Sequence, residues 1–315
     1  MNNKIYYPEV DIVKGIAILL VIMGHACCTF PMNLDAELSW LHPFFRCVQM
    51  PLFFLASGFL FKMNGGGDFW RKKLTRLLIP YIVFASLSIL LRFAFAPFTR
   101  SGSPGLLNSV IALFTGGYYW FLYALLVIMV LCRFLKEKRF LCMALIFSFI
   151  VPYFIGDGQV PSIVYRITYF LFFFILGICV KPYYASLTLN YKRLYCISLS
   201  CLIVYIILLC PFVRQFVEFK HLTQIIGCVA FWGVSLMIAQ TKLLNRILSF
   251  FGHYSLQFYL NHLLILLPCF YLGKFFPVQI PLVQWLVVFV SATFLSWLML
   301  LIENKVKFLH KFCGL

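Results

Sequence analysis

Two ionisable side chains within one apolar stretch near the start of the sequence are the clearest candidates for chemistry. Lys14 and His25 lie 11 residues apart, which is about three helical turns, so a helix would place both on one face roughly 16 Å apart along its axis. An imidazole accepts and releases a proton near neutral pH, and a lysine ammonium binds phosphate. The pair could hold the two ends of a long, narrow ligand. Two plainer interpretations stay open: Lys14 extends to lipid headgroups, or His25 is a buried histidine bonded to a carbonyl.

Further polar side chains fall in apolar stretches elsewhere in the sequence. Arg46 and Gln49 lie in the second stretch, and Asn261 and His262 lie in the ninth. A polar or charged group inside a membrane helix is costly unless it faces a partner or a wet cavity. These four residues are therefore candidates for binding an acceptor substrate or for stabilising developing charge, with anchoring at headgroups as the alternative for the arginine.

Acidic residues are scarce and avoid the middle of the apolar stretches. The chain has nine Asp and Glu residues, and proton-coupled transporters usually need an acidic group at depth, so the pattern disfavours transport. It also leaves His25 without an acidic group to orient it. A backbone carbonyl, Ser57, Tyr123 or Asn261 is the expected substitute.

The composition is that of an integral membrane protein. Hydrophobic residues make up 63% of the 315 positions and charged residues 11%, and the mean hydropathy is +0.97. The net charge of +17 does not indicate nucleic-acid binding, because the basic residues lie between apolar stretches and no polar domain gathers them. The twelve cysteines lack ligand spacing, so no metal site is expected.

The fold predicted from hydropathy is all-α, a single polytopic domain over residues 1–315 with about ten transmembrane helices. Lys4 and the segments 62–76, 133–139, 181–193, 242–246 and 305–311 hold 18 of the 26 basic residues, whereas segments 31–43 and 156–163 hold none. The positive-inside rule therefore predicts that both termini are cytoplasmic. The expected spans are residues 10–30, 43–61, 77–96, 118–135, 140–155, 164–180, 194–213, 222–240, 253–272 and 282–302.

Several of these stretches resemble one family. The stretch 11–25, DIVKGIAILLVIMGH, is similar to the first helix of the acyltransferase-3 family, which carries Lys or Arg, ten residues and then His. The stretch 50–59, MPLFFLASGF, resembles its second-helix signature, although Gln49 stands where family members often have His. Three more stretches match in order: 77–81, 119–122 and 255–262.

The resemblance, closest to the fucose 4-O-acetylase-like subgroup, implies an O-acyltransferase in the plasma membrane of a bacterium. Its donor would be cytoplasmic acetyl-CoA or a similar acyl-CoA, used as co-substrate with no bound cofactor. Its acceptor would be a hydroxyl of a cell-surface polysaccharide or lipid-linked sugar precursor. His25 would act as general base or would carry the acyl group itself. The residues expected to bind the donor are Lys14, Ser57, Arg71, Lys72 and Arg76.

Two other functions remain as alternatives. A transporter or flippase for a lipid-linked saccharide would also have polar residues along a path, but it offers no reason for the spacing of Lys14 and His25. A non-catalytic membrane scaffold leaves the intramembrane His25 and Arg46 unexplained. Only the enzyme requires an acyl donor.

Overall fold

The structure is a computed structural model, and every element that it describes is a helix. The described residues are 6–29, 41–63, 65–95, 105–155, 158–184, 191–210, 213, 220–272 and 280–315. The predicted basic-poor segment 31–43 lies mostly outside them.

Ten helices coincide with the ten predicted apolar stretches. They are α1 (Pro8–Thr29), α3 (Leu41–Phe59), α4 (Gly67–Phe95), α6 (Trp120–Phe134), α7 (Lys138–Phe154), α8 (Ser162–Val180), α10 (Tyr191–Leu209), α12 (Lys220–Ala239), α14 (Ser255–Leu272) and α15 (Pro281–Lys305).

Within the described part of the chain, six helices are long and apolar enough to cross a membrane. The protein is therefore a multi-pass membrane protein, while the count of ten spans and the cytoplasmic termini stay predictions. The six segments are Pro8–Cys27, Trp70–Ala94, Ser162–Tyr183, Lys192–Leu209, His221–Ala239 and Pro281–Lys305.

Short helices that hydropathy did not predict join the long ones. Helix α13 (Lys242–His253) follows α12, and its 12 residues are too few to cross a bilayer. The others are α5 (Leu106–Phe114), η2 (Lys181–Tyr183) and α16 (Lys307–Cys313).

The helices form two compact units. The first contains residues 1–60 and 176–298, and the second contains residues 61–175 and 299–315. In the second unit, Arg76 of α4 donates from Nε to the Gly314 carbonyl at 2.9 Å, which ties the residues after α16 to α4.

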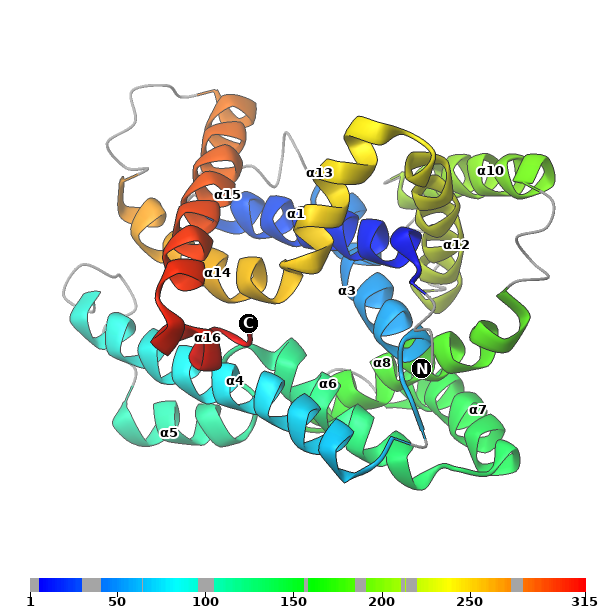
Figure 1. Cartoon of the computed structure of the whole chain (residues 1–315), viewed down its shortest axis with the longest axis horizontal. Helices are drawn as coiled ribbons and strands as arrows, with labels where there is room; N and C mark the ends of the chain where they lie inside the picture. The colour runs from blue at the N-terminus through cyan, green and yellow to red at the C-terminus, as the bar shows by residue number, and fades with distance from the viewer. Residues whose placement is uncertain are drawn as a thin grey trace. The chain divides into compact units, whose positions relative to one another are not determined.

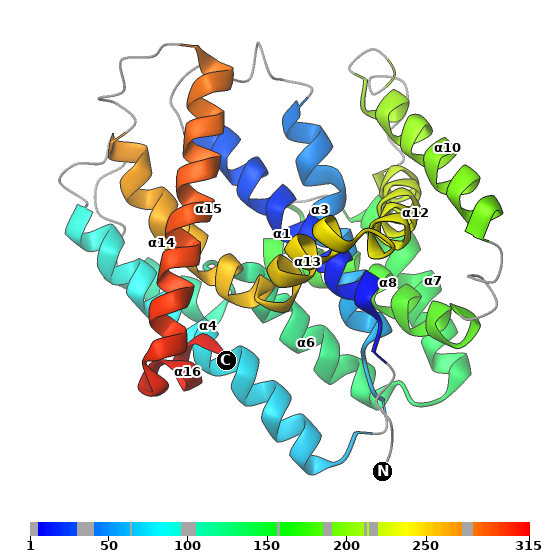
Figure 2. The ribbon, with the colours of Figure 1, turned by 45° about the horizontal axis from the view of Figure 1, so that its top comes forward.

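In the first unit, α13 crosses α1 with the two backbones in contact (Figure 1). A Cβ atom at Gly252 of α13 would lie 2.5 Å from the Asp11 carbonyl carbon, and one at Gly15 of α1 would lie 2.9 Å from the carbonyl carbon of Leu248. Both distances are shorter than real Cβ atoms show, so only glycine permits this crossing. Figure 2 shows α1 and α13 from a second side, with α3 and α14 in the same unit.

A third glycine brings α8 onto α3. A Cβ atom at Gly177 would lie 2.7 Å from the Phe59 backbone nitrogen and 3.1 Å from the Gly58 carbonyl carbon. Gly58 near the end of α3 therefore meets another glycine on the neighbouring helix.

Candidate active site

Helix α1 is unbroken from Pro8 to Thr29, so the 11-residue spacing places Lys14 and His25 on one face, as predicted. Ile18 and Val21 lie between them on that face, and both are fully buried. The face therefore packs against protein and not against lipid.

His25 meets a second histidine that lies 237 positions further along the chain. His25 Nδ1 lies 2.9 Å from Nε2 of His262 on α14. His262 is fully buried, and its Nδ1 lies 2.8 Å from the Phe258 carbonyl oxygen one turn earlier. Three groups therefore form a chain of hydrogen bonds from the α14 backbone to the α1 imidazole.

The two rings meet edge to edge. Their planes differ by 10° and their centres are 5.2 Å apart. That separation is the 2.9 Å between the nitrogens plus about one ring radius on each side, so both nitrogens lie near the line joining the centres. Coplanar rings in this arrangement form a near-linear N–H···N hydrogen bond rather than a face-to-face stack.

Helix α3 supplies the next side chains, because α1 has a glycine where the two helices approach. A Cβ atom at Gly24 would lie 3.2 Å from Gln49 Oε1 and 3.4 Å from Arg46 Cγ. Gly24 directly precedes His25, so the predicted residues Arg46 and Gln49 lie against the turn of α1 that carries the imidazole. Arg46 is close enough to act electrostatically on His25.

His42 also belongs to this group. The Arg46 guanidinium lies 3.4 Å from His42 Nε2, one turn away on α3, and His42 also acts electrostatically on His25. Arginine only donates, so that His42 nitrogen accepts. The site thus gathers three imidazoles and one guanidinium around the C-terminal part of α1.

Two buried amides near this group make few internal hydrogen bonds. Gln49 Oε1 and both side-chain amide atoms of Asn261 are buried without a hydrogen-bond partner among the described residues. Gln49 is 4% exposed and Asn261 is 0% exposed. A buried amide atom without a hydrogen-bond partner destabilises the fold by about 1–3 kcal/mol. A polar ligand that bonds to such an atom would remove this cost.

Helix α15 fixes the same part of α1 from another side. The Trp285 indole donates from Nε1 to the Met23 carbonyl oxygen at 3.0 Å. Met23 lies two residues before His25, so the indole helps to hold the turn of α1 that carries the imidazole.

Lys14 forms an ion pair that the sequence analysis did not predict. Its Nζ lies 3.6 Å from Asp11 Oδ1, with 21% and 17% of the two side chains exposed. Asp11 also accepts a hydrogen bond from the Tyr6 hydroxyl at 3.1 Å. The Lys14 charge is therefore shared with a carboxylate, and its role toward a donor phosphate stays a prediction.

The other predicted donor-binding residues divide between the two units. Ser57 is half-buried in α3 of the first unit. Arg71 and Lys72 are exposed on α4 of the second unit, where Arg76 bonds to the Gly314 carbonyl. The role of these residues in binding the donor stays a prediction.

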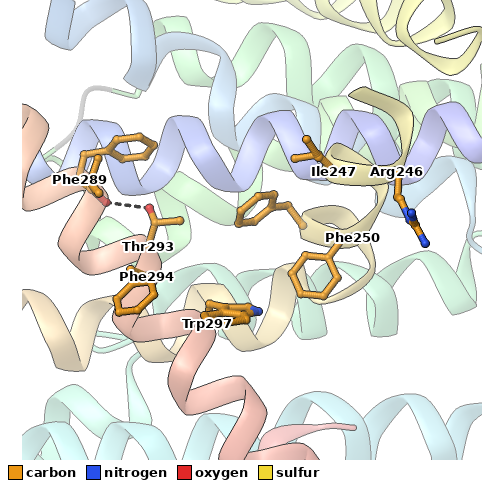
Figure 3. Close-up of a pocket in the computed structure, with 9 residues that line it drawn as sticks. Arg246, Ile247, Phe250, Phe289, Thr293, Phe294 and Trp297 are labelled. Atoms are coloured by element: carbon orange, nitrogen blue, oxygen red, sulfur yellow. Dashed lines mark hydrogen bonds between the residues drawn. The ribbon is translucent and has the colours of Figure 1, made fainter. Parts of the chain in front are cut away.

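A groove of about 600 Å³ lies between α13 and α15 (Figure 3). Its described lining is apolar and aromatic apart from Arg246 and Thr293, and the Thr293 hydroxyl bonds to the Phe289 carbonyl at 2.8 Å. None of the predicted site residues lines it, so it is not part of the His25 site.

Sequence reasoning missed the direct partner of His25. The expected orienting groups were a backbone carbonyl, Ser57, Tyr123 or Asn261, whereas His262 lies at hydrogen-bond distance. The scarcity of carboxylates together with a second intramembrane histidine was the available signal. His42 was also missed, and its position four residues before Arg46 was the signal there.

Comparison with known proteins identifies the family. The acyltransferase-3 family, described as an acyltransferase domain, matches residues 7–301, and the chain belongs to this family. The nodulation protein NolL of Sinorhizobium fredii is 31% identical over 212 residues, which are 61% of this chain and 55% of that protein. NolL of Mesorhizobium japonicum is 31% identical over 134 residues, which are 39% of this chain and 34% of that protein.

The chain therefore spans about half or less of the length of these curated relatives. The comparison with solved structures found no match to this chain.

Proposed function

We propose that this chain transfers an acetyl or similar short acyl group from cytoplasmic acyl-CoA to a hydroxyl of a cell-surface polysaccharide or lipid-linked sugar. Its place would be the cytoplasmic membrane of a bacterium. Family membership supports the acyl-transfer class. The observation that carries the proposal is the His25 imidazole, held by His262 on the protein-facing side of a membrane helix.

His25 is the proposed base of the transfer. Its ring takes the proton from the acceptor hydroxyl while the hydroxyl oxygen attacks the thioester carbonyl carbon. The C–S bond then breaks, the proton passes to the departing thiolate, and the products are the acyl ester and free coenzyme A. A route in which the imidazole first attacks the thioester and then passes the acyl group to the hydroxyl uses the same ring nitrogen.

Arg46 is the proposed electrostatic partner in this step. Negative charge develops on the thioester oxygen as the bond forms, and a guanidinium beside His25 stabilises that charge. Its nearness to His25 supports this role. Binding of an anionic sugar acceptor is the second use that its charge allows.

Gln49 and Asn261 are the proposed contacts to the acceptor. A sugar offers hydroxyl groups that donate and accept, and the buried amide atoms of these two residues offer the complementary partners. Two buried amides near an imidazole suit a polyol better than an apolar acceptor.

The donor side is proposed at the other end of α1. Lys14, with Ser57 of the same unit, would receive the phosphates and the narrow pantetheine arm of acyl-CoA. The basic residues Arg71, Lys72 and Arg76 of the second unit stay a separate prediction for binding the donor. The axial distance between Lys14 and His25 suits a ligand that is anionic at one end and carries a thioester at the other.

The test is acyl transfer by purified protein in proteoliposomes with radiolabelled acetyl-CoA and a sugar acceptor. The variant His25→Ala should fold and insert normally but lose transfer, by at least about 100-fold, the lower range for a general base. His253→Ala is the matched control, because this exposed imidazole ends α13 in the same unit.

Near-normal transfer by the His25→Ala protein would overturn the proposal. Movement of a lipid-linked saccharide across the liposome membrane without any acyl donor would instead support a transporter.

A further inference from the structure

The hydrogen-bond chain that ends on His25 begins at a group that can only accept. The Phe258 carbonyl oxygen lies 2.8 Å from His262 Nδ1, so His262 must carry a proton on that nitrogen. His262 is fully buried, and an imidazolium there would incur a large desolvation cost. No Asp or Glu occurs in the sequence of α14 to offset it. His262 is therefore the neutral tautomer with a lone pair on Nε2.

The tautomer of His262 determines which nitrogen of His25 carries the proton. Because His262 Nε2 has a lone pair, His25 Nδ1 at 2.9 Å must donate to it. The coplanar, edge-to-edge placement of the rings suits that bond. A neutral imidazole has one N–H, so His25 then has its basic lone pair on Nε2.

We infer that His262, anchored on the Phe258 carbonyl, is a positioning residue that holds His25 in the tautomer with a basic Nε2. This inference rests on the proposed function. His262 takes the place that a carboxylate has in other bases oriented by a third group. When His25 Nε2 takes the hydroxyl proton, the resulting imidazolium keeps its Nδ1 proton in a charge-assisted bond to His262.

A neutral His262 imidazole suits this buried position better than a carboxylate would. A buried carboxylate would need its own partners, whereas neutral His262 needs only an acceptor on its own helix, which Phe258 supplies one turn away. The bond pattern also sets the ring's direction: Nδ1 faces α14, so Nε2 faces away from α14.

Two substitutions of His262 separate positioning from general packing. The side-chain oxygen of glutamine reaches about as far as Nε2 and can accept from His25, whereas the asparagine amide reaches only about as far as Nδ1. The variant His262→Gln should keep kcat within tenfold of the parent. The variant His262→Asn should lower kcat about 100-fold with the KM values of donor and acceptor unchanged.

A second measurement reads the tautomer without any activity. Solid-state ¹⁵N NMR of histidine-labelled protein in lipid should show His25 protonated at Nδ1 and not at Nε2, with its signals assigned by their loss in His25→Gln. The chain has six histidines, so this assignment is tractable. In the His262→Asn protein the Nε2-protonated form should gain population.

Each result decides one question. His25 protonated at Nε2 in the parent protein, or parental kcat in His262→Asn, would overturn the positioning role while leaving His25 as the proposed base. Full activity of His25→Ala would overturn the proposed function, and the tautomer spectrum would still report whether His262 sets the ring. If His262→Asn fails to fold, the parent spectrum and His262→Gln still decide.

Discussion

Replacing Gly252 with alanine tests the backbone contact that joins α13 to the helix carrying His25. The added methyl carbon would lie 2.5 Å from the Asp11 carbonyl carbon and closer still to its oxygen. Ordinary contact begins at 3.4 Å, so the two helices must separate by at least 0.9 Å here. No side-chain rotation can relieve the clash, because the obstructing atoms belong to the backbone of α1.

The magnitude follows from that separation. Gaps of about 0.5–1 Å already lose a quarter to a half of the dispersion energy of each contact, and overpacking costs about 1–3 kcal/mol. Alanine returns about 0.5–1 kcal/mol through its better helix propensity. The expected net loss is about 2 kcal/mol, which is roughly a thirtyfold change in the ratio of folded to unfolded protein.

A second substitution, at Gly15, tests the same contact between α1 and α13 more specifically. An alanine methyl carbon there would lie 2.9 Å from the Leu248 carbonyl carbon and closer still to its oxygen. This clash is milder than the one at Gly252, and it should cost about 1 kcal/mol alone. Gly252→Ala already opens the same crossing further. The double variant should therefore be about as stable as Gly252→Ala, with a coupling of about 1 kcal/mol.

The assay is reversible unfolding in mixed detergent micelles, followed by tryptophan fluorescence and circular dichroism. Gly67→Ala is the control, because this glycine begins α4 and a Cβ atom there meets nothing within 4 Å. Parental stability of Gly252→Ala, or strictly additive losses in the double variant, would refute the contact between the two backbones.

Two further predictions concern charged groups of α1. Lys14→Gln should raise the KM for acyl-CoA at least about tenfold in the transfer assay if the ammonium binds the donor. An unchanged KM would rule out that role and leave the ion pair with Asp11 in place. Tyr184→Phe should lower the free energy of unfolding by about 1.5–3 kcal/mol in micelles, because the hydroxyl donates at 2.7 Å to the buried carboxyl group of Glu9. Tyr183→Phe is the control, because the Tyr183 ring is 67% exposed, and it should leave the free energy of unfolding unchanged. Equal losses of stability in Tyr184→Phe and Tyr183→Phe would contradict the role of the hydrogen bond to Glu9.

Local sequence properties predicted the helices well. Each of the ten predicted stretches coincides with a helix, because length and hydropathy are read within one window of the chain. Helix α13 escaped this reasoning, since its polar face includes Lys242 and Arg246 and its length falls short of a span. Helix α13 is a short amphipathic helix, which is stabilised by packing of its apolar face against the rest of the protein.

The same local rules predicted part of the site. A regular helix forces Lys14 and His25 onto one face, whatever surrounds them. The cost of polar groups in apolar stretches also predicted four further site residues from the sequence. They are Arg46, Gln49, Asn261 and His262.

By itself, then, the sequence determined a membrane protein of apolar helices with an imidazole and a cation aligned on the first of them. Only the tertiary structure decided that His25 is held by His262, 237 positions away, and that Gly15 and Gly252 let α13 lie against α1. The physical reason is that helix formation and burial in lipid depend on neighbours within a few turns. Which side chains meet between helices depends on how whole surfaces pack together.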